Sequence, residues 1–190
     1  MNICFLNSIN FWGGGEKLHL ENAIEFRHLG HKVIIAARED SPLHTKSKLH
    51  GFKTVNVKIG NLSFLNPLKH IQLIKFFKKN NIDTVIFSAS QDLKLGSLSA
   101  NFAGVKRIVY MRGLATPVKG TPLNKIIYKN VLTHIIANSK ATKNGILKNL
   151  TNYIESHKIK VIYHGIDLKH KVNITNKNLL RSTERGLYSA

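Results

Sequence analysis

Short runs rich in valine and isoleucine recur along the chain, and stretches with helical spacing of apolar residues separate most of them. Runs of four to eight such residues predict strands, and apolar positions three and four residues apart predict helices. The predicted strands lie at 2–7, 32–37, 52–59, 83–89, 107–112, 134–139 and 160–165. The predicted helices lie at 16–30, 65–79, 92–103, 122–132 and 140–154.

This alternation of strands and helices predicts the fold class. Apolar strands joined through helices favour a parallel sheet, because right-handed crossovers place helices on both faces. We therefore expect an α/β, Rossmann-like, doubly wound sheet over residues 1–167. Gly30 should end the first helix, and Asn66 with Pro67 should open the helix at 65–79. The polar residues 168–190 contain no convincing strand and are expected to form a linker or tail.

Composition agrees with one globular domain. The chain has 190 residues, of which 43% are hydrophobic and 21% are charged. No apolar run reaches the roughly 18 residues of a membrane-spanning helix, and the N-terminus lacks the pattern of a secretory signal. A single cysteine, Cys4, excludes a disulfide framework within the chain. We expect a cytoplasmic protein that does not span the membrane.

Net charge is the unusual property of this sequence. It amounts to +19, and no Asp or Glu occurs between Asp40 and Asp83 or between Asp92 and Glu155. A field of this sign indicates a polyanionic partner, such as nucleic acid, anionic lipid or a phosphorylated substrate. The charge alone does not choose among the three.

Three consecutive glycines, Gly13, Gly14 and Gly15, follow the first predicted strand and open the first helix. Backbone amides at such a position can receive a phosphate at close range, because no side chain stands in the way. The segment lacks the last glycine of G-x-G-x-x-G and the Lys-Ser/Thr ending of the P-loop. It predicts a generic anion loop, or a turn that needs glycine for its geometry alone. Replacing Gly14 by Val should block a phosphate and strain any positive φ there.

The segment at 11–37 resembles the first β-α-β unit of the family-4 glycosyltransferases. It has a double glycine followed by Glu16, an amphipathic helix, and the sequence Gly-His-x-Val at 30–33. The segments at 134–142 (HIIANSKAT) and 161–167 (VIYHGID) resemble two later elements of that family, in the same order. The resemblance therefore extends over nearly the whole chain up to the end of the last segment.

The resemblance implies the N-terminal, acceptor-binding half of a two-domain GT-B fold, and a second half, outside this chain, that holds most of the nucleotide-sugar. In such enzymes the glycine loop faces the donor diphosphate, so the resemblance assigns donor-phosphate binding to Gly13, Gly14 and Gly15. The nucleotide-sugar is a co-substrate, and no cofactor is implied. The chain alone is expected to show no appreciable transfer.

Polar residues follow the fourth and fifth predicted strands, at the edge where a doubly wound sheet builds its cleft. Ser90, Gln91 and Arg112 are our candidates for acceptor binding, and Arg112 can pair with an acceptor phosphate or carboxylate. Asp92 is a candidate catalytic residue that orients or deprotonates the acceptor hydroxyl, although an aspartate that opens a helix often serves as its N-cap.

Two positions depart from the family pattern. Relatives often carry a histidine near the place of Arg112, which leaves the contact to the transferred sugar unassigned. In the last segment Tyr163 and His164 stand where proline and asparagine are more usual, and we do not assign His164 a catalytic role. The ten histidines show no metal-ligand spacing, and no Gly-x-Ser-x-Gly motif is present. We expect neither a bound metal nor a serine hydrolase.

One face of the helix at 65–79 combines apolar and basic residues. Leu68 and Ile71 fall among Lys75, Lys78 and Lys79, whereas the remaining apolar residues cluster on the opposite side. Such a face suits an anionic membrane surface. The alternative is that both apolar clusters belong to the core and the lysines form a solvated rim.

Together these observations favour a glycosyltransferase of bacterial cell-surface glycan assembly, acting on lipopolysaccharide, capsule or a similar acceptor at the inner face of the cell membrane. Its partners would be a nucleotide-sugar donor, a glycan or lipid-linked acceptor and the anionic membrane. One alternative is a non-catalytic glycan- or membrane-binding remnant. A basic nucleic-acid-binding domain is a weaker alternative, because no recognised motif or stacking-aromatic pattern accompanies the charge.

Overall fold

The computed structural model describes residues 1–165. The strands are β1 (Asn2–Asn7), β2 (Lys32–Ala37), β3 (Lys53–Asn56), β4 (Thr84–Phe87), β5 (Arg107–Arg112), β6 (His134–Ala137) and β7 (Ile159–Val161). The α-helices are α1 (Gly14–His28), α2 (Pro42–Leu49), α3 (Pro67–Lys79), α4 (Ser90–Ala103), α5 (Pro122–Ile126) and α6 (Lys140–Leu147). Short helical turns are η1 (Ser63–Leu65), η2 (Ile127–Val131), η3 (Thr151–Tyr153) and η4 (Ser156–Lys158).

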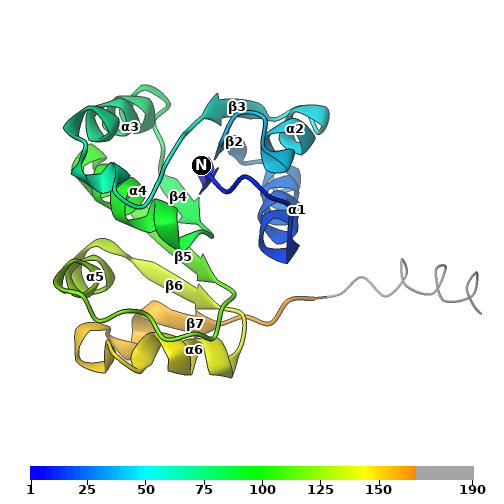
Figure 1. Ribbon diagram of the computed structural model, residues 1–190. Coiled ribbons are helices and arrows are strands. Elements are labelled where there is room, and N and C mark those ends of the chain that lie inside the picture. Colours follow the sequence, from blue (N-terminus) through cyan, green and yellow to red (C-terminus); the bar gives the residue numbers. More distant parts are fainter. Residues whose placement is uncertain (166–190) are drawn as a thin grey trace, which may run out of the picture.

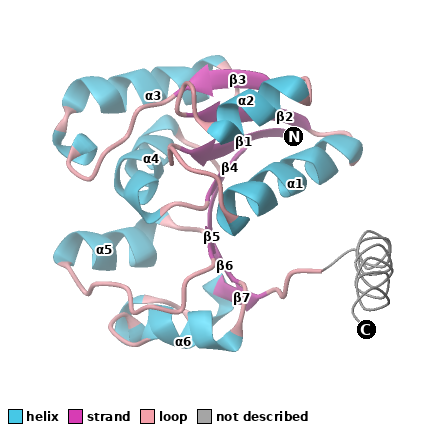
Figure 2. Ribbon diagram, turned by 45° about the vertical axis from the view of Figure 1, so that its right-hand side comes forward, coloured by secondary structure: helices cyan, strands magenta, loops and turns pink. Residues whose placement is uncertain are grey.

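All strands join one parallel sheet in the order β3-β2-β1-β4-β5-β6-β7. The chain winds from β1 outward to β3, then returns to β4 and winds outward to β7, as Figure 1 shows. The direction of winding therefore changes between the neighbouring strands β1 and β4, which Figure 2 shows side by side. The predicted doubly wound α/β fold is confirmed, and a ligand site is expected where these two strands end.

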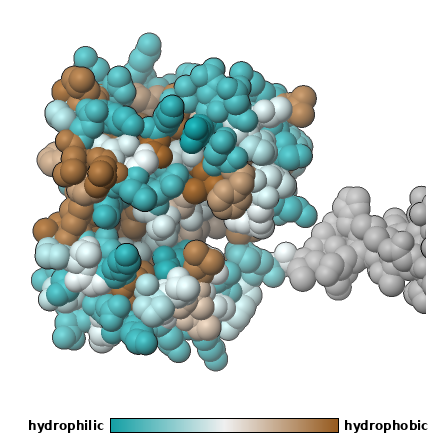
Figure 3. All heavy atoms as spheres, viewed as in Figure 1, coloured by the Kyte–Doolittle hydropathy of each residue, from teal (hydrophilic) through white to brown (hydrophobic). Residues whose placement is uncertain are grey.

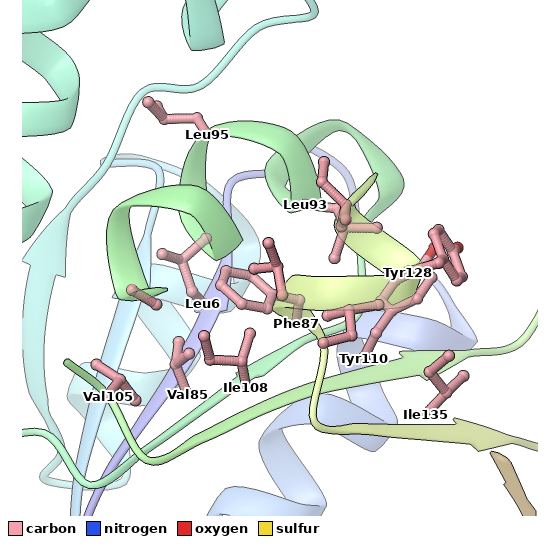
Figure 4. Close-up of a cluster of buried hydrophobic side chains, with 14 of the residues drawn as sticks. Leu6, Val85, Phe87, Leu93, Leu95, Val105, Ile108, Tyr110, Tyr128 and Ile135 are labelled. Carbon is pink, nitrogen blue, oxygen red and sulfur yellow. The ribbon is translucent and has the colours of Figure 1, made fainter. Parts of the chain in front are cut away.

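Both faces of the central strands are buried. Ile3 and Phe5 of β1 pack with residues of α1 and α2 on one face, whereas Cys4 and Leu6 pack with α3 and α4 on the other. Figure 4 shows Phe87 near the middle of the second cluster. A Cβ on residue 96 would collide with the Phe87 ring, so α4 approaches the sheet closely because that residue is glycine. This contact fixes the distance between α4 and the sheet.

Helices do not cover both faces everywhere. On β6, Ile135 and Ala137 are buried beneath α6 and its neighbours, whereas Ile136 on the opposite face is half-buried. On β7, Lys160 is exposed on that same uncovered side. Within residues 1–165 the prediction of helices on both faces therefore holds for the centre of the sheet and not for this edge.

Several predicted element boundaries were wrong. Helix α2 was not predicted, although Ser41 accepts a hydrogen bond from the backbone N–H of His44 at 3.2 Å and Pro42 opens the helix, which is a strong start signal. The helix expected at 140–154 ends at Leu147 and is followed by η3. The helix expected at 122–132 continues after Ile126 as a wider π-type turn.

Other local predictions are confirmed. Asn66 caps α3 by accepting from the backbone N–H of Leu68 at 2.9 Å, with Pro67 in the first helical position. Helix α1 ends before Gly30, whose φ of 81° is in the left-handed region that favours glycine. The predicted tail at 168–190 lies outside the described residues.

Candidate functional site

A cavity of about 640 Å³ opens at the carboxyl ends of β1, β4 and β5. Its volume falls within the range of about 300–1,000 Å³ that is usual for small-molecule sites. Most of the residues that the sequence singled out line it together: Gly13, Gly14, Gly15, Ser90, Gln91 and Arg112. Ser88, at the end of β4, lines it as well. Asp92 is not part of the lining. The space-filling view in Figure 3 shows the surface hollowed right of the centre, between the part of the molecule with α1 and the lower part with α6 and β7.

The glycine loop is held by hydrogen bonds on its buried side and faces the cavity on its other side. Buried Glu16 accepts hydrogen bonds from the backbone N–H of Gly13 at 3.1 Å and from Asn7 Nδ2 at 3.2 Å. The N-cap of α1 is Gly13, which has no side chain to occupy the first free amides of the helix. A ligand in the cavity can therefore accept hydrogen bonds directly from these backbone amides.

Backbone strain does not explain the glycines. Among the glycines of the described residues, positive φ values occur at Gly30, Gly51 and Gly104 and not in the loop, so the strain expected for a positive φ does not arise at Gly14. A Cβ added to Gly14 or Gly15 would meet no atom within 4 Å. The space above these two residues is empty of protein, which is the property that close approach of a ligand requires.

Polar side chains tie together the strand ends beneath the cavity. Asn7 at the end of β1 donates from Nδ2 to Ser88 Oγ at 2.9 Å, and its Oδ1 accepts from the backbone N–H of Ile9 at 2.9 Å. Gln91 Nε2 donates to Ser8 Oγ at 3.0 Å. These bonds hold the glycine loop and the start of α4 in a fixed relation at the point where the winding changes direction.

Asp92 lies behind the cavity wall. It is fully buried in the first turn of α4, where one carboxylate oxygen accepts from the backbone N–H of Ser8 at 2.8 Å and the other from the Ser8 hydroxyl. Burial raises the pKa of Asp92 to about 6, against the opposing effect of the Ser8 hydrogen bonds. The N-cap of α4 is Ala89, so the alternative that Asp92 caps this helix was wrong. In this geometry Asp92 joins the end of β1 to α4.

Arg112 brings a buried positive charge to the cavity. It is 8% exposed, and it donates from Nη2 to the Thr116 carbonyl oxygen at 2.6 Å and from Nη1 to the Tyr110 hydroxyl at 3.3 Å. Its Nε has no hydrogen-bond partner, and none of the ion pairs within residues 1–165 includes Arg112. Because a buried cation without a counter-charge is costly, this arrangement favours an anionic ligand.

Sequence reasoning missed several lining residues. Phe11 and Leu114 are 64% and 67% exposed at the cavity, which offers apolar contacts to a sugar ring or a base. His164, which we set aside, also lines it. His19 lies in the wall with both ring nitrogens unpartnered, edge-on to Phe5, and burial lowers its pKa to about 3. Its one sequence signal was its place three residues after Glu16 on the same helix face.

The basic and apolar face of α3 is exposed. Leu68 and Ile71 are 66% and 46% exposed, and Lys75, Lys78 and Lys79 are also exposed. The alternative that both apolar clusters are core was therefore wrong. No helix within residues 1–165 has both the length and the hydropathy required to cross a bilayer. No cluster of potential metal ligands occurs in the same range.

Comparison with known proteins assigns the family. Residues 12–170 match the model of Glycosyltransferase Family 4. The chain belongs to this family. A UDP-Gal:alpha-D-GlcNAc-diphosphoundecaprenol alpha-1,3-galactosyltransferase of Escherichia coli is 30% identical over 136 residues, which cover 67% of this chain and 35% of that relative. The family predicted from the glycine loop and the two later segments is therefore confirmed.

Solved structures show the same fold. A glycosyltransferase of Rickettsia africae superimposes with a TM-score of 0.76 at 19% identity, over 100% of this chain and 50% of that one. HepE of Anabaena, solved with UDP-glucose, superimposes with a TM-score of 0.67 at 19% identity, over 89% of this chain and 45% of that one. The chain thus spans about half the length of these structures and about a third of the curated relative.

Proposed function

We propose that this chain supplies the acceptor-binding half of a glycosyltransferase that moves a sugar from a nucleotide-sugar to a lipid-linked or other glycan acceptor of a bacterial cell surface. The observation that carries the proposal is the cavity where the glycine loop and the buried charge of Arg112 line one space. The names of the relatives support a UDP-sugar donor and a diphosphate-linked lipid acceptor. A second, donor-binding half completes the enzyme.

The glycine loop is assigned to the donor diphosphate. The first amides of α1, at Gly14, Gly15 and Glu16, have no intrahelical acceptor, and the positive end of the helix dipole lies at the same place. Negative charge develops on the nucleoside diphosphate as the bond between the sugar and the diphosphate of the donor breaks. Amides that are already oriented toward that charge stabilise the transition state more than the ground state.

Ser90, Gln91 and Arg112 are assigned to the acceptor. Ser90 is exposed at the start of α4, and the guanidinium of Arg112 is held in place by the Tyr110 hydroxyl and the Thr116 carbonyl. A direct catalytic role for Asp92 requires its carboxylate to exchange Ser8 for the acceptor hydroxyl. Without that exchange, Asp92 acts as a positioning residue that fixes Ser8 and the first turn of α4.

The exposed face of α3 is assigned to the anionic inner face of the cell membrane. Each lysine near such a surface contributes on the order of 1 kcal/mol, and shallow insertion of apolar side chains adds to the attraction. Leu68 and Ile71 supply the apolar part, and Lys75, Lys78 and Lys79 supply the charge. This surface would keep the enzyme beside a lipid-linked acceptor.

Transfer is tested with a protein completed by a donor-binding half. UDP-galactose, UDP-glucose and UDP-N-acetylglucosamine are offered with a lipid diphosphate that carries one sugar. We expect transfer from one of them by the completed protein and none by residues 1–190 alone, because donor contacts of the transition state lie in the second half. A folded, completed protein that transfers from none of them refutes the proposed function. Rapid turnover by residues 1–190 alone refutes the assignment of the donor half.

Membrane binding is tested by sedimentation with phosphatidylglycerol liposomes. Replacing Lys75, Lys78 and Lys79 together by Gln should lower the affinity and its salt dependence, whereas Leu68→Ser should reduce mainly the binding that persists at high salt. Leu49→Ser is the matched control, because Leu49 is 82% exposed at the end of α2. Equal binding by all variants contradicts the assignment. Tight binding to duplex DNA with no liposome binding would favour the nucleic-acid alternative.

A further inference from the structure

A second cavity of about 400 Å³ adjoins the first. It lies between the first turns of α4 and the segment that leads from β5 into α5. The two cavities share five lining residues, Asn61, Ser90, Gln91, Arg112 and Leu114. The acceptor side of the first cavity therefore continues into the second.

The second cavity is the more basic of the two. Lys94 and Lys119 line it and do not line the first, and Arg112 stands in the wall between them. No carboxylate lines the second cavity, whereas Glu16 lines the first. None of the ion pairs within residues 1–165 includes Lys94 or Lys119. Three cations without an anion face one space large enough for a diphosphate.

Neutral donors complete the lining for an anion. Thr116 and Asn124 line the cavity with Lys119. Ser90 and Gln91 present the start of the 14-residue helix α4, and their two backbone amides have no acceptor within the helix. The unpartnered Nε of Arg112 is an independent sign, since this side chain is more than nine-tenths buried and belongs to the wall. The chemistry of the whole lining matches phosphate oxygens.

The same cavity reaches the apolar surface beside α3. Lys94 Nζ lies 4.8 Å from the ring centre of Phe64 in η1. Leu62 and Leu65, on either side of Phe64 in the chain, are 72% and 67% exposed, and Asn61 of the cavity wall directly precedes Leu62. Figure 3 shows hydrophobic side chains gathered at the left edge, over the place of η1 in Figure 1. A charged site thus lies next to a surface suited to a lipid chain.

We propose that the second cavity binds the diphosphate of a lipid-linked acceptor, with Lys94, Lys119 and Arg112 as its ligands. The lipid leaves past Leu62 and Leu65 toward the membrane, and the sugar to be extended enters the first cavity. This inference rests on the proposed function for the identity of the ligand. It adds to that function a separate phosphate site, distinct from the glycine loop, and two residues that give specificity for a phosphorylated acceptor.

Binding is tested on the 190-residue chain with farnesyl diphosphate, inorganic diphosphate, UDP and phosphatidylglycerol vesicles as separate probes. Lys94→Gln and Lys119→Gln should each weaken binding of farnesyl diphosphate about tenfold, and Lys94→Arg should restore it. Lys125→Gln is the matched control, because the Lys125 ammonium lies over a tyrosine ring in the same way as Lys94 over Phe64 but does not line the cavity. Thermal unfolding verifies that each variant is folded.

The probes separate the possible sources of phosphate. Equal loss of UDP and farnesyl diphosphate binding would place donor phosphates in this cavity and overturn the proposal. Loss of vesicle binding with unchanged farnesyl diphosphate binding would assign the lysines to the membrane, and would overturn it as well. The variants that weaken binding of farnesyl diphosphate should also weaken binding of inorganic diphosphate, because the two lysines contact phosphate groups in both.

Transfer by the completed protein separates this inference from the proposed function. Lys94→Gln and Lys119→Gln should raise KM for the lipid diphosphate acceptor about tenfold and leave KM for the nucleotide-sugar unchanged. If transfer proceeds and both variants keep the acceptor KM, the second cavity is not the diphosphate site although the function stands. If no transfer occurs but the variants lose farnesyl diphosphate, the site stands and the proposed function fails.

Discussion

Gly14→Ala separates ligand approach from backbone geometry in the glycine loop. The residue occupies the first position of α1, its φ is not positive, and a Cβ there would meet no protein atom within 4 Å. The folded domain can therefore accept alanine without strain. The added methyl group would stand in the space that a phosphate oxygen needs to reach the helix amides.

The two effects of the substitution have opposite signs. Alanine in place of glycine stabilises a helix by at most about 1 kcal/mol, which raises the Tm of a domain of this size by about 2–4 °C. Loss of one hydrogen bond to a charged oxygen costs about 1.5–3 kcal/mol, which corresponds to roughly a 10- to 150-fold loss in kcat/KM for the nucleotide-sugar. The variant should be as stable as the parent or more so, and much less active.

Thermal unfolding of residues 1–190 and steady-state kinetics of the completed protein measure the two effects. Gly104→Ala is the contrasting control, because Gly104 has a φ of 79° at the end of α4 and does not line either cavity. It should lose about 1 kcal/mol of stability and keep its KM values. Unchanged kcat/KM in a folded Gly14→Ala variant would refute the phosphate role and leave the loop a structural turn.

Three further substitutions, with Gly113→Ala as a control for the third, test residues in and behind the wall of the site. The pKa of Asp92 is raised from 3.8 to about 6, so its stabilising contribution is complete below pH 3.8 and is lost as the pH rises through 6. At about 1.36 kcal/mol per unit of pKa difference, the loss in the free energy of unfolding amounts to about 3 kcal/mol. Asp92→Asn should not show this loss when its unfolding by urea is measured against pH. The pKa of His19 is lowered from 6.5 to about 3, so its contribution is present above pH 6.5 and is lost as the pH falls toward 3. His19→Phe should remove this loss of stability at acid pH, and an unchanged pH dependence would show that folding does not lower the pKa of His19. Gly145→Ala should collide with the Ala115 carbonyl, cost about 1–3 kcal/mol of stability and raise the acceptor KM. Gly113→Ala, whose Cβ would lie 3.6 Å from its nearest neighbour, should keep full stability in the same unfolding assay.

The parts of the fold that could be predicted are those with a local cause. The strands around Ile35 and Val85 are uninterrupted apolar runs. Gly30 follows the end of α1, and Asn66 with Pro67 opens α3. The effects of these residues depend on their nearest neighbours in the chain alone. Helix α2 had a start signal of the same kind at Ser41. It was missed because its eight residues bury Leu43, His44 and Ser47, of which only the first is apolar, so no hydrophobic period marks it.

The parts of the site that could not be predicted depend on distant pairing. Ser8 reaches Asp92 across 84 positions of sequence, and Asn7 reaches Ser88 across 81. Neither pair has a sequence signal, because each forms only where β1 and β4 lie side by side. The sheet edge at Ser90, Gln91 and Arg112 followed from the general rule for doubly wound sheets, whereas burial of Asp92 followed from packing that no local pattern encodes.

The positive charge of the chain acquires a location once the fold is known. Between Asp92 and Glu155 the sequence contains ten lysines and arginines and no carboxylate, and this stretch builds most of α4 together with β5, α5, β6 and α6. These elements follow one another on one side of the winding reversal; α5, β6 and α6 form the lower part of Figure 1, and α4 lies above them beside α3. The first cavity opens where that side meets the glycine loop, and the second cavity adjoins the first. Walls of low dielectric constant focus the field into both cavities. A surface of scattered lysines would attract any polyanion weakly. In the folded protein Arg112, Lys94 and Lys119 bring part of this charge to the walls of the cavities. The same charge that leaves the partner undefined in sequence therefore favours a phosphorylated substrate once the fold is known.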